Sequence, residues 1–294
     1  MVIKRIVCLW VLLLLSSGSG ASDFDSTYVS VSVVGSGGDV ILVNGLASSP
    51  AVWAETVDQL QSSYRVHVFS IKGFAGTQAA ASTPDVYLEA LRDEVLGYIQ
   101  HAQLDSPVVI GHSMGGLVSL MVGSASPDAV SKIIVVDALP FYSLLFNAQA
   151  TSALVAPFAF GLEKLLLVMS PAQYEAHVRK SAGIMVKSPE RIETIVHWAN
   201  ITDRAVNAQL VREVMTYDGR VLLDQITAPI YVMYAYDSAM PASAEQLEDL
   251  YLTAYSRANT VDLKQIDDAN HFIMWDQPEA FHKYLDHVLL NSEL

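Results

Sequence analysis

The sequence is poor in cysteine and in positively charged residues. Its 294 residues include one cysteine, Cys8, which excludes a disulfide within the chain. Lys and Arg number 17 against 31 Asp and Glu, which gives a formal net charge of −14. Such a charge disfavours the phosphates of nucleic acids and anionic membrane surfaces, so we expect neither as a partner. Because 52% of the residues are hydrophobic, the core is large enough to fold without disulfides.

Apolar runs long enough to span a membrane are also missing. The run over residues 6–15 follows Lys4 and Arg5 and precedes small residues that end at Ala21. It is too short for a permanent membrane helix, and this order of basic, apolar and small residues is typical of a secretory signal peptide. We therefore expect residues 1–21 to be removed, the protein to be secreted or periplasmic, and no stable membrane anchor after cleavage. An uncleaved anchor is the alternative.

The rest of the chain changes its pattern twice. Over residues 22–138 strands and helices alternate, which predicts a parallel sheet with helices on both faces. Residues 139–224 contain helical blocks without a convincing strand, and alternation returns over residues 225–294. This pattern predicts an α/β core in two parts with a helical lid inserted between them.

The expected elements follow from hydrophobic periodicity. The strands cover residues 27–34, 40–43, 65–71, 108–110, 132–137, 229–236 and 259–266. The first two, separated by glycines, are expected to form a hairpin. The helical blocks of the lid cover residues 158–170, 171–182, 189–200 and 203–217.

Three β-branched residues at 108–110 lead directly into Gly111-His112-Ser113-Met114-Gly115-Gly116, and a helix-compatible run follows. A buried strand that turns abruptly into a helix needs glycines where the backbones come close. The serine then lies at the tip of the turn, with the positive end of the helix dipole behind it. This context predicts a nucleophile elbow with Ser113 as the nucleophile.

A serine hydroxyl needs a base to accept its proton. Of the eight histidines, His271 fits best because it follows the last strand and precedes the last helix. His112 adjoins Ser113, but in a tight elbow its side chain points away from the serine. We expect His271 to be the base.

Two carboxylates compete to support that base, since both follow strands whose ends meet at one edge of the sheet. Asp237 follows the strand 229–236 and gives the order Ser, Asp, His along the chain, whereas Asp137 ends the strand after the elbow helix. Asp237 is preferred because its turn is expected to face the histidine loop.

The reaction also needs hydrogen-bond donors for the oxyanion. We expect them to be the backbone N–H groups of Met114, directly after the nucleophile, and of Leu46, in the loop after residue 43. Gly45 lets that loop approach the bound carbonyl.

The motif at residues 111–116, the turn Asp237-Ser238-Ala239-Met240-Pro241 and the segment 271–279 resemble the α/β-hydrolase-fold serine hydrolases, in their lidded esterase- and lipase-like branch. The resemblance covers nearly all of the chain after the leader, outside the lid. It implies the α/β-hydrolase fold, catalytic residues Ser113, Asp237 and His271, oxyanion donors Leu46 and Met114, no cofactor and no bound metal. Asn44 stands where that family often has histidine.

Together with the signal peptide expected at residues 1–21, the resemblance implies an exported enzyme that cleaves carboxylic esters through an acyl-enzyme. Its expected substrates are small-molecule esters or lactones, with an apolar acyl part because the lid is rich in aliphatic and aromatic residues. Serine at the elbow argues against the dehalogenase and epoxide-hydrolase branches, which have aspartate there. The alternatives are a lactonase, a hydrolase of another acyl or carbon–carbon bond, and a ligand-binding member without turnover.

Overall fold

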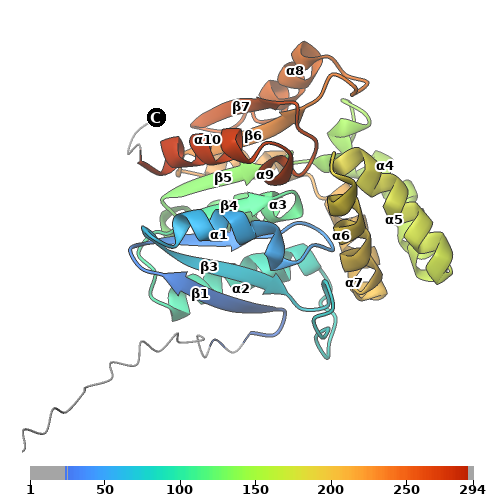
Figure 1. Cartoon of the computed structure of the whole chain (residues 1–294), viewed down its shortest axis with the longest axis horizontal. Coiled ribbons are helices and arrows are strands. Elements are labelled where there is room, and N and C mark those ends of the chain that lie inside the picture. Colours follow the sequence, from blue (N-terminus) through green and yellow to red (C-terminus); the bar gives the residue numbers. More distant parts are fainter. Residues whose placement is uncertain (1–23, 25, 291–294) are drawn as a thin grey trace, which may run out of the picture.

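The sheet that organises the chain has seven strands, in the order β1-β3-β2-β4-β5-β6-β7. The computed structural model describes residue 24 and residues 26–290, so the expected signal peptide lies outside the described residues. All neighbouring strands are parallel except β1, which runs antiparallel to β3 (Figure 1). The strands are β1 (Val29–Gly35), β2 (Gly38–Val43), β3 (Tyr64–Ile71), β4 (Val108–His112), β5 (Lys132–Val136), β6 (Ile230–Tyr236) and β7 (Val261–Asp267).

The expected hairpin between the first two strands is wrong, because β3 lies between them. Val29 of β1 pairs with Ile71, and Leu42 of β2 pairs with Val68. The connection passes close to the start of β3: a Cβ on Gly35 would lie 2.3 Å from the carbonyl oxygen of Tyr64. Gly35 also has φ +79°, a conformation that favours glycine, so the chain can cross there without forming a hairpin ladder.

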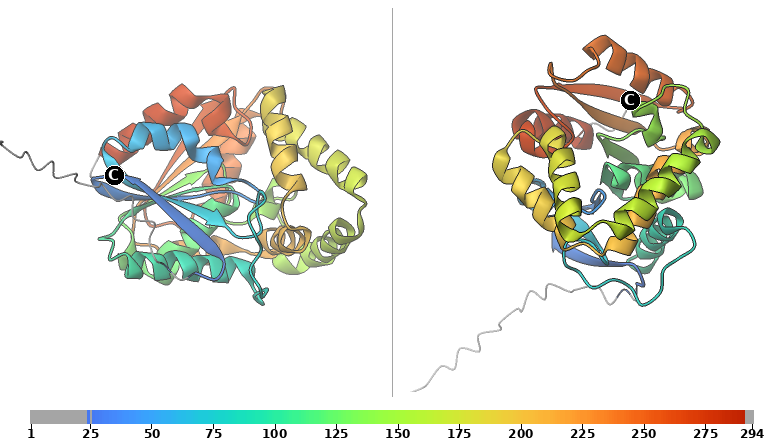
Figure 2. Two further views of the ribbon diagram at one scale, coloured as in Figure 1. Left: turned by 60° about the horizontal axis from the view of Figure 1, so that its bottom comes forward. Right: turned by 90° about the vertical axis from the view of Figure 1, so that its right-hand side faces the viewer.

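Helices cover both faces of the sheet, as Figure 2 shows in its left view. One face packs against α2 (Tyr87–His101), α3 (Met114–Ala125) and α8 (Ala244–Ala254), and the other against α1 (Ala54–Leu60) and α10 (Pro278–Leu290). Strand residues alternate between these two cores: Ile41 faces the first and Leu42 the second. The burial of both faces explains why the central strands are apolar without a break.

Four helices lie between β5 and β6 in the sequence and to one side of the sheet in space (Figures 1 and 2). These inserted helices are α4 (Ser152–Val168), α5 (Pro171–Met185), α6 (Pro189–Asn200) and α7 (Arg204–Thr216). Helix α4 begins six residues before the expected block at 158–170, because Thr151 caps it by accepting from the backbone N–H of Leu154.

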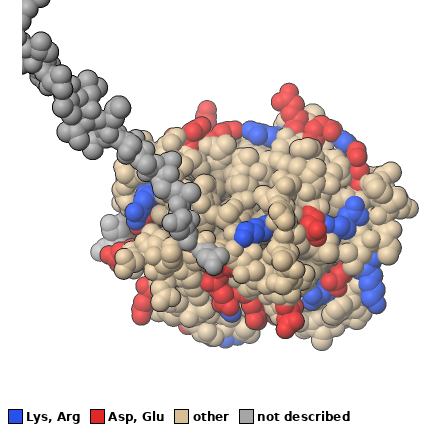
Figure 3. All heavy atoms as spheres, turned by 90° about the horizontal axis from the view of Figure 1, so that it is seen from below, with Lys and Arg blue, Asp and Glu red and all other residues tan. Residues whose placement is uncertain are grey.

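The described surface shows no gathering of basic residues on the face in Figure 3, where Lys and Arg are scattered among Asp and Glu. Within residues 26–290, none of the helices combines the length and the apolar character needed to cross a bilayer.

Candidate active site

Ser113 lies at a sharp turn between β4 and α3, in a strained conformation with φ +55° and ψ −122°. Positive φ is uncommon for a residue with a side chain and is found at functional sites. The surrounding backbones leave no room for side chains: a Cβ on Gly111 would lie 2.1 Å from the carbonyl oxygen of Gly115, and one on Gly115 would lie 2.2 Å from that of Val43. The glycines of the motif are therefore required for the turn, which presents the Ser113 side chain to a cavity.

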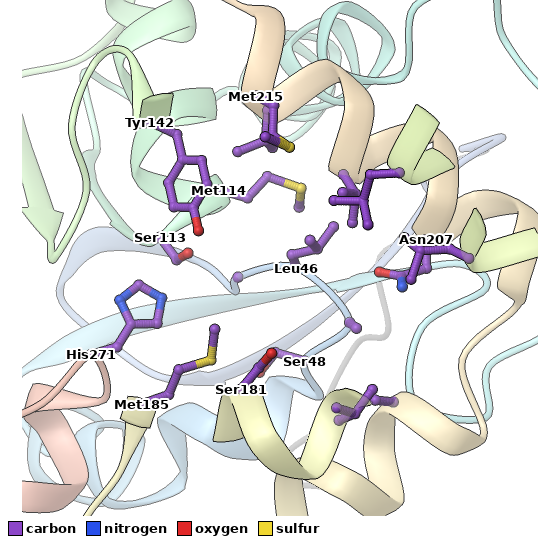
Figure 4. A pocket seen from close by; sticks show the side chains of 18 of the residues that line it. Leu46, Ser48, Ser113, Met114, Tyr142, Ser181, Met185, Asn207, Met215 and His271 are labelled. Carbon is purple, nitrogen blue, oxygen red and sulfur yellow. The ribbon is translucent and has the colours of Figure 1, made fainter. Parts of the chain in front are cut away.

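His271 lies in the loop between β7 and α9 (Ile273–Asp276) and lines the same cavity as Ser113. Figure 4 shows both side chains at one end of it. His271 Nδ1 lies 2.7 Å from Asp137 Oδ2, and because a carboxylate accepts, Nδ1 donates. A neutral imidazole with its hydrogen on Nδ1 leaves Nε2 free to accept a proton.

Asp137, directly after β5, is the carboxylate that supports His271. Its other oxygen, Oδ1, accepts from the backbone N–H of Ala235 at 2.8 Å and from the hydroxyl of Tyr251 at 3.5 Å. Burial, with the charge of Asp137 next, raises the pKa of Tyr251 well above its usual value, so this phenol remains a donor. Both carboxylate oxygens therefore have partners, and the group is held in one orientation.

The prediction that Asp237 supports His271 is wrong in this structure. The Asp237 carboxylate pairs with Lys187 Nζ at 2.6 Å and accepts from the backbone N–H of Ala239. The hydrogen bond from Lys187 lowers the pKa of Asp237. Lys187 belongs to the connection between α5 and α6, so a residue of the insertion binds the carboxylate that the sequence assigned to the histidine.

His112 has a structural function at the site that the sequence did not reveal. Its ring is buried, and its Nε2 donates to the backbone carbonyl oxygen of His271 at 2.9 Å. Burial, followed by the proximity of His271, lowers the pKa of His112 well below 6.5 and keeps the ring neutral. The His112 ring therefore restrains the loop that carries His271.

The expected oxyanion residues, Leu46 and Met114, both line the cavity. Met114 is the first residue of α3, so its N–H has no acceptor within the helix. The loop of Leu46 is braced by Asn44, whose Nδ2 donates to the carbonyl oxygens of Ser48 at 2.5 Å and Gly45 at 3.3 Å. Asn44 is fully buried, and its hydrogen bonds restrain this loop.

The connection between α5 and α6 is attached to the histidine loop. The backbone N–H of Phe272 donates to the carbonyl oxygen of Met185 at 3.1 Å. Asp276 accepts from the N–H of Lys187 with Oδ1 and from the N–H of Asn270 with Oδ2. Together with the Lys187–Asp237 ion pair, these bonds join the insertion to the segment around His271.

The cavity has a volume of about 710 Å³ and lies between the sheet edge and the inserted helices. Its apolar lining comes mostly from the insertion: Leu154, Val155, Phe158, Leu162, Leu166, Val178, Ala182, Met185, Ile195, Val211 and Val214. The described residues contain no group of three or more His, Cys, Asp or Glu side chains that could hold a metal ion.

Comparisons with known proteins identify the family of the chain. Residues 40–283 match the model of the alpha/beta hydrolase family. A pimeloyl-[acyl-carrier protein] methyl ester esterase of Aliivibrio fischeri (strain MJ11) is 28% identical over 227 residues, which is 72% of this chain and 84% of that protein.

Among solved structures, the enol-lactonase from Burkholderia xenovorans LB400 superposes with a TM-score of 0.71 and 18% identity, over 90% of this chain and 96% of that one. The esterase EaEST from Exiguobacterium antarcticum gives a TM-score of 0.74 and 18% identity, over 90% of this chain and all of its own. At these identities, the two structures establish the shared fold.

Replacing each of the two aspartates should affect the expected ester hydrolysis to a different extent. Asp137→Asn leaves the imidazole without its charged partner and should lower kcat for a p-nitrophenyl ester by about 10³-fold or more. Asp237→Asn removes a partner of Lys187 and should change kcat by less than about tenfold. Circular dichroism should show both variants folded. A large loss in Asp237→Asn alone would contradict the assignment of Asp137.

The neutral His112 predicts a loss of stability in acid. Its pKa is lower in the folded than in the unfolded chain, so below about pH 6.5 the unfolded chain binds a proton that the folded chain does not. The free energy of unfolding should fall by up to about 1.4 kcal/mol per pH unit from this group. Urea unfolding between about pH 7.5 and 5.5 measures the slope.

His112→Gln keeps an amide donor toward the His271 carbonyl and removes the titration, so its stability should depend less steeply on pH. Burial also lowers the pKa values of His67 and His282. Both residues remain in the wild-type protein and in the variant, so they contribute equally to the two pH slopes. Equal slopes for the two proteins would refute the prediction.

Proposed function

The chain belongs to the alpha/beta hydrolase family, and we propose that it is a serine hydrolase that cleaves carboxylic esters of small molecules. The proposal depends on one observation above all, the hydrogen bond from His271 Nδ1 to Asp137 at the wall of the cavity into which Ser113 projects. A serine on a strained elbow with an oriented imidazole in the same cavity is the arrangement that acyl transfer requires.

In the proposed reaction, Ser113 Oγ attacks the ester carbonyl carbon while His271 Nε2 accepts the hydroxyl proton. The imidazolium that forms is stabilised by the Asp137 carboxylate, which stays ionised. When the tetrahedral intermediate collapses, His271 returns the proton to the alcohol and the acyl group remains on Ser113. Water then attacks this ester with His271 again as the base, which releases the acid and restores the hydroxyl.

The negative charge on the carbonyl oxygen needs donors that are fixed before the reaction begins. We assign them to the backbone N–H groups of Leu46 and Met114. The hydrogen bonds of Asn44 to the Leu46 loop support this assignment, because they restrain the loop without the substrate. The N–H of Met114 lies at the start of a helix, where the helix dipole also favours negative charge.

The acyl part of the substrate is proposed to be apolar. The lining of the cavity supports this, since aliphatic and aromatic side chains predominate and no Lys or Arg contributes to it. We further propose that the inserted helices act as a lid, because they supply most of this lining. We propose esters, and not other acyl compounds, as the substrates because relatives such as the Aliivibrio protein are named methyl ester esterases. Lactones, which the same groups would open, are the second substrate class to assay.

Removal of the Ser113 hydroxyl tests this function. Ser113→Ala should lower kcat for short- and long-chain p-nitrophenyl esters by about 10³-fold or more. A fluorophosphonate probe should label the wild-type protein at Ser113 and leave the variant unlabelled. A wild-type protein that binds these esters without turning them over, and that no probe labels, would instead be a ligand-binding member of the family.

Export is the second part of the proposal, and it is supported by the residues at 1–21 alone. Expression of the full chain in a Gram-negative host should place the protein in the periplasm or medium, with its first residue near Ser22. N-terminal sequencing of the recovered protein measures this. A cytoplasmic protein that still begins at Met1 would overturn it.

A further inference from the structure

Among the polar side chains of the cavity wall, Ser143 and Ser181 have hydrogen-bond partners within the protein. Ser143 Oγ donates to the carbonyl oxygen of Met215 at 2.7 Å, and Ser181 Oγ donates to that of His177 at 3.2 Å. These hydroxyls are already occupied by the protein. Asn207 differs, because its Oδ1 is buried and has no hydrogen-bond partner among the described residues.

Asn207 lies on α7 and is only 6% exposed. Its Nδ2 donates to the hydroxyl of Tyr174, on α5, at 2.9 Å. Tyr174 is also buried and lines the cavity, and its ring is fixed beneath the Arg204 guanidinium at 3.6 Å. Figure 4 shows Asn207 across the cavity from His271, with Leu46 between them and the amide oxygen turned toward the cavity.

One other buried polar atom of the cavity wall has no partner in the described structure, and its position differs. His112 Nδ1 faces the backbone of Gly45, where even a Cβ would lie only 3.0 Å away. The Gly45 backbone therefore covers this nitrogen. Asn207 Oδ1 is an acceptor that a substrate could supply with a donor, and an unpaired buried acceptor favours a ligand that does so.

We propose that Asn207 and Tyr174 form a polar subsite that binds a hydroxyl group on the acyl part of the substrate, away from the ester that is cleaved. The inference rests on the proposed esterase function, because it is the acyl group that would extend across the cavity from Ser113. The hydroxyl donates to Asn207 Oδ1 and accepts the phenol hydrogen of Tyr174, which the bond from Asn207 leaves free.

The chemistry of the pair selects a hydroxyl over other polar groups. An ionised carboxylate has no hydrogen for Asn207 Oδ1, and no Lys or Arg lines the cavity to balance its charge. Burial raises the pKa of Tyr174, so the phenol keeps its hydrogen and can donate. A hydroxyl both donates and accepts, so it pairs with the Asn207 amide in either of its two orientations.

Pairs of p-nitrophenyl esters test the subsite. In each pair, one ester has a plain alkanoyl chain and the other has the same chain with one hydroxyl group. The position of this hydroxyl is varied along the chain, one carbon at a time. At the best position, the wild-type kcat/KM should be about tenfold higher for the hydroxyacyl ester, as expected for one buried hydrogen bond. In Asn207→Leu this ratio should fall to about one. Equal rates at every position would overturn the proposal.

Two further variants keep the result interpretable. Asn207→Leu leaves the Tyr174 hydroxyl without its donor. The double variant with Tyr174→Phe removes both polar groups and should therefore fold. Its ratio of kcat/KM between the hydroxyacyl and alkanoyl esters should also be about one. Ser181→Ala removes a hydroxyl of the cavity wall that already has a partner, and the hydroxyl preference should persist in it. A ratio that falls equally in Ser181→Ala would contradict a specific subsite.

Binding separates this inference from the proposed function. Ser113→Ala cannot form an acyl-enzyme, and it should bind the best hydroxyacyl ester about tenfold more tightly than its alkanoyl counterpart. Hydrolysis without any hydroxyl preference in rate or binding would refute the subsite and leave the esterase intact. Preferential binding without hydrolysis by the wild-type protein would refute the esterase and leave the subsite.

Discussion

The hydrogen bond between His271 and Asp137 joins the two parts of the chain that the inserted helices separate. Its partners are 134 residues apart, and three neighbouring strands meet at the carboxylate. Asp137 follows β5, the N–H that fixes its second oxygen belongs to Ala235 of β6, and the histidine comes from the loop after β7. The site therefore depends on the parallel order of the sheet, which places the ends of these strands at one edge.

Much of the fold could be predicted because its signals are local. The apolar strands and the glycines around Ser113 are properties of short segments, and each expected strand has a counterpart in the sheet. The pairing of β1 could not be predicted in the same way. Alternating residues and a glycine connection fit a hairpin equally well, and the crossing at β3 depends on the close approach of Gly35 to Tyr64, which comes from a distant segment.

The same distinction applies to the site. Ser113 and His271 stand in motifs that can be recognised, whereas Asp137 and Asp237 both follow strands at the correct edge. The structure separates these two aspartates through Lys187, a residue of the insertion whose position no local pattern gives. The structural functions of His112 and Asn44 could not be predicted for a related reason. Each side chain binds backbone carbonyl oxygens, and every residue type has such an oxygen.

The attachment of the α5–α6 connection to the histidine loop has a mechanical consequence. The backbone N–H of Phe272, next to His271, donates a hydrogen bond to the carbonyl oxygen of Met185. The Asp276 carboxylate accepts from the backbone N–H groups of Lys187 and Asn270. An outward movement of this corner of the insertion would have to break these hydrogen bonds or displace the loop that carries His271. If the inserted helices act as the proposed lid, an opening that leaves His271 in place is expected at α4, which exposes Leu154 and Phe158 to solvent and has no part in these hydrogen bonds. On that proposal, substrate entry and the alignment of His271 would depend on different helices of the insertion.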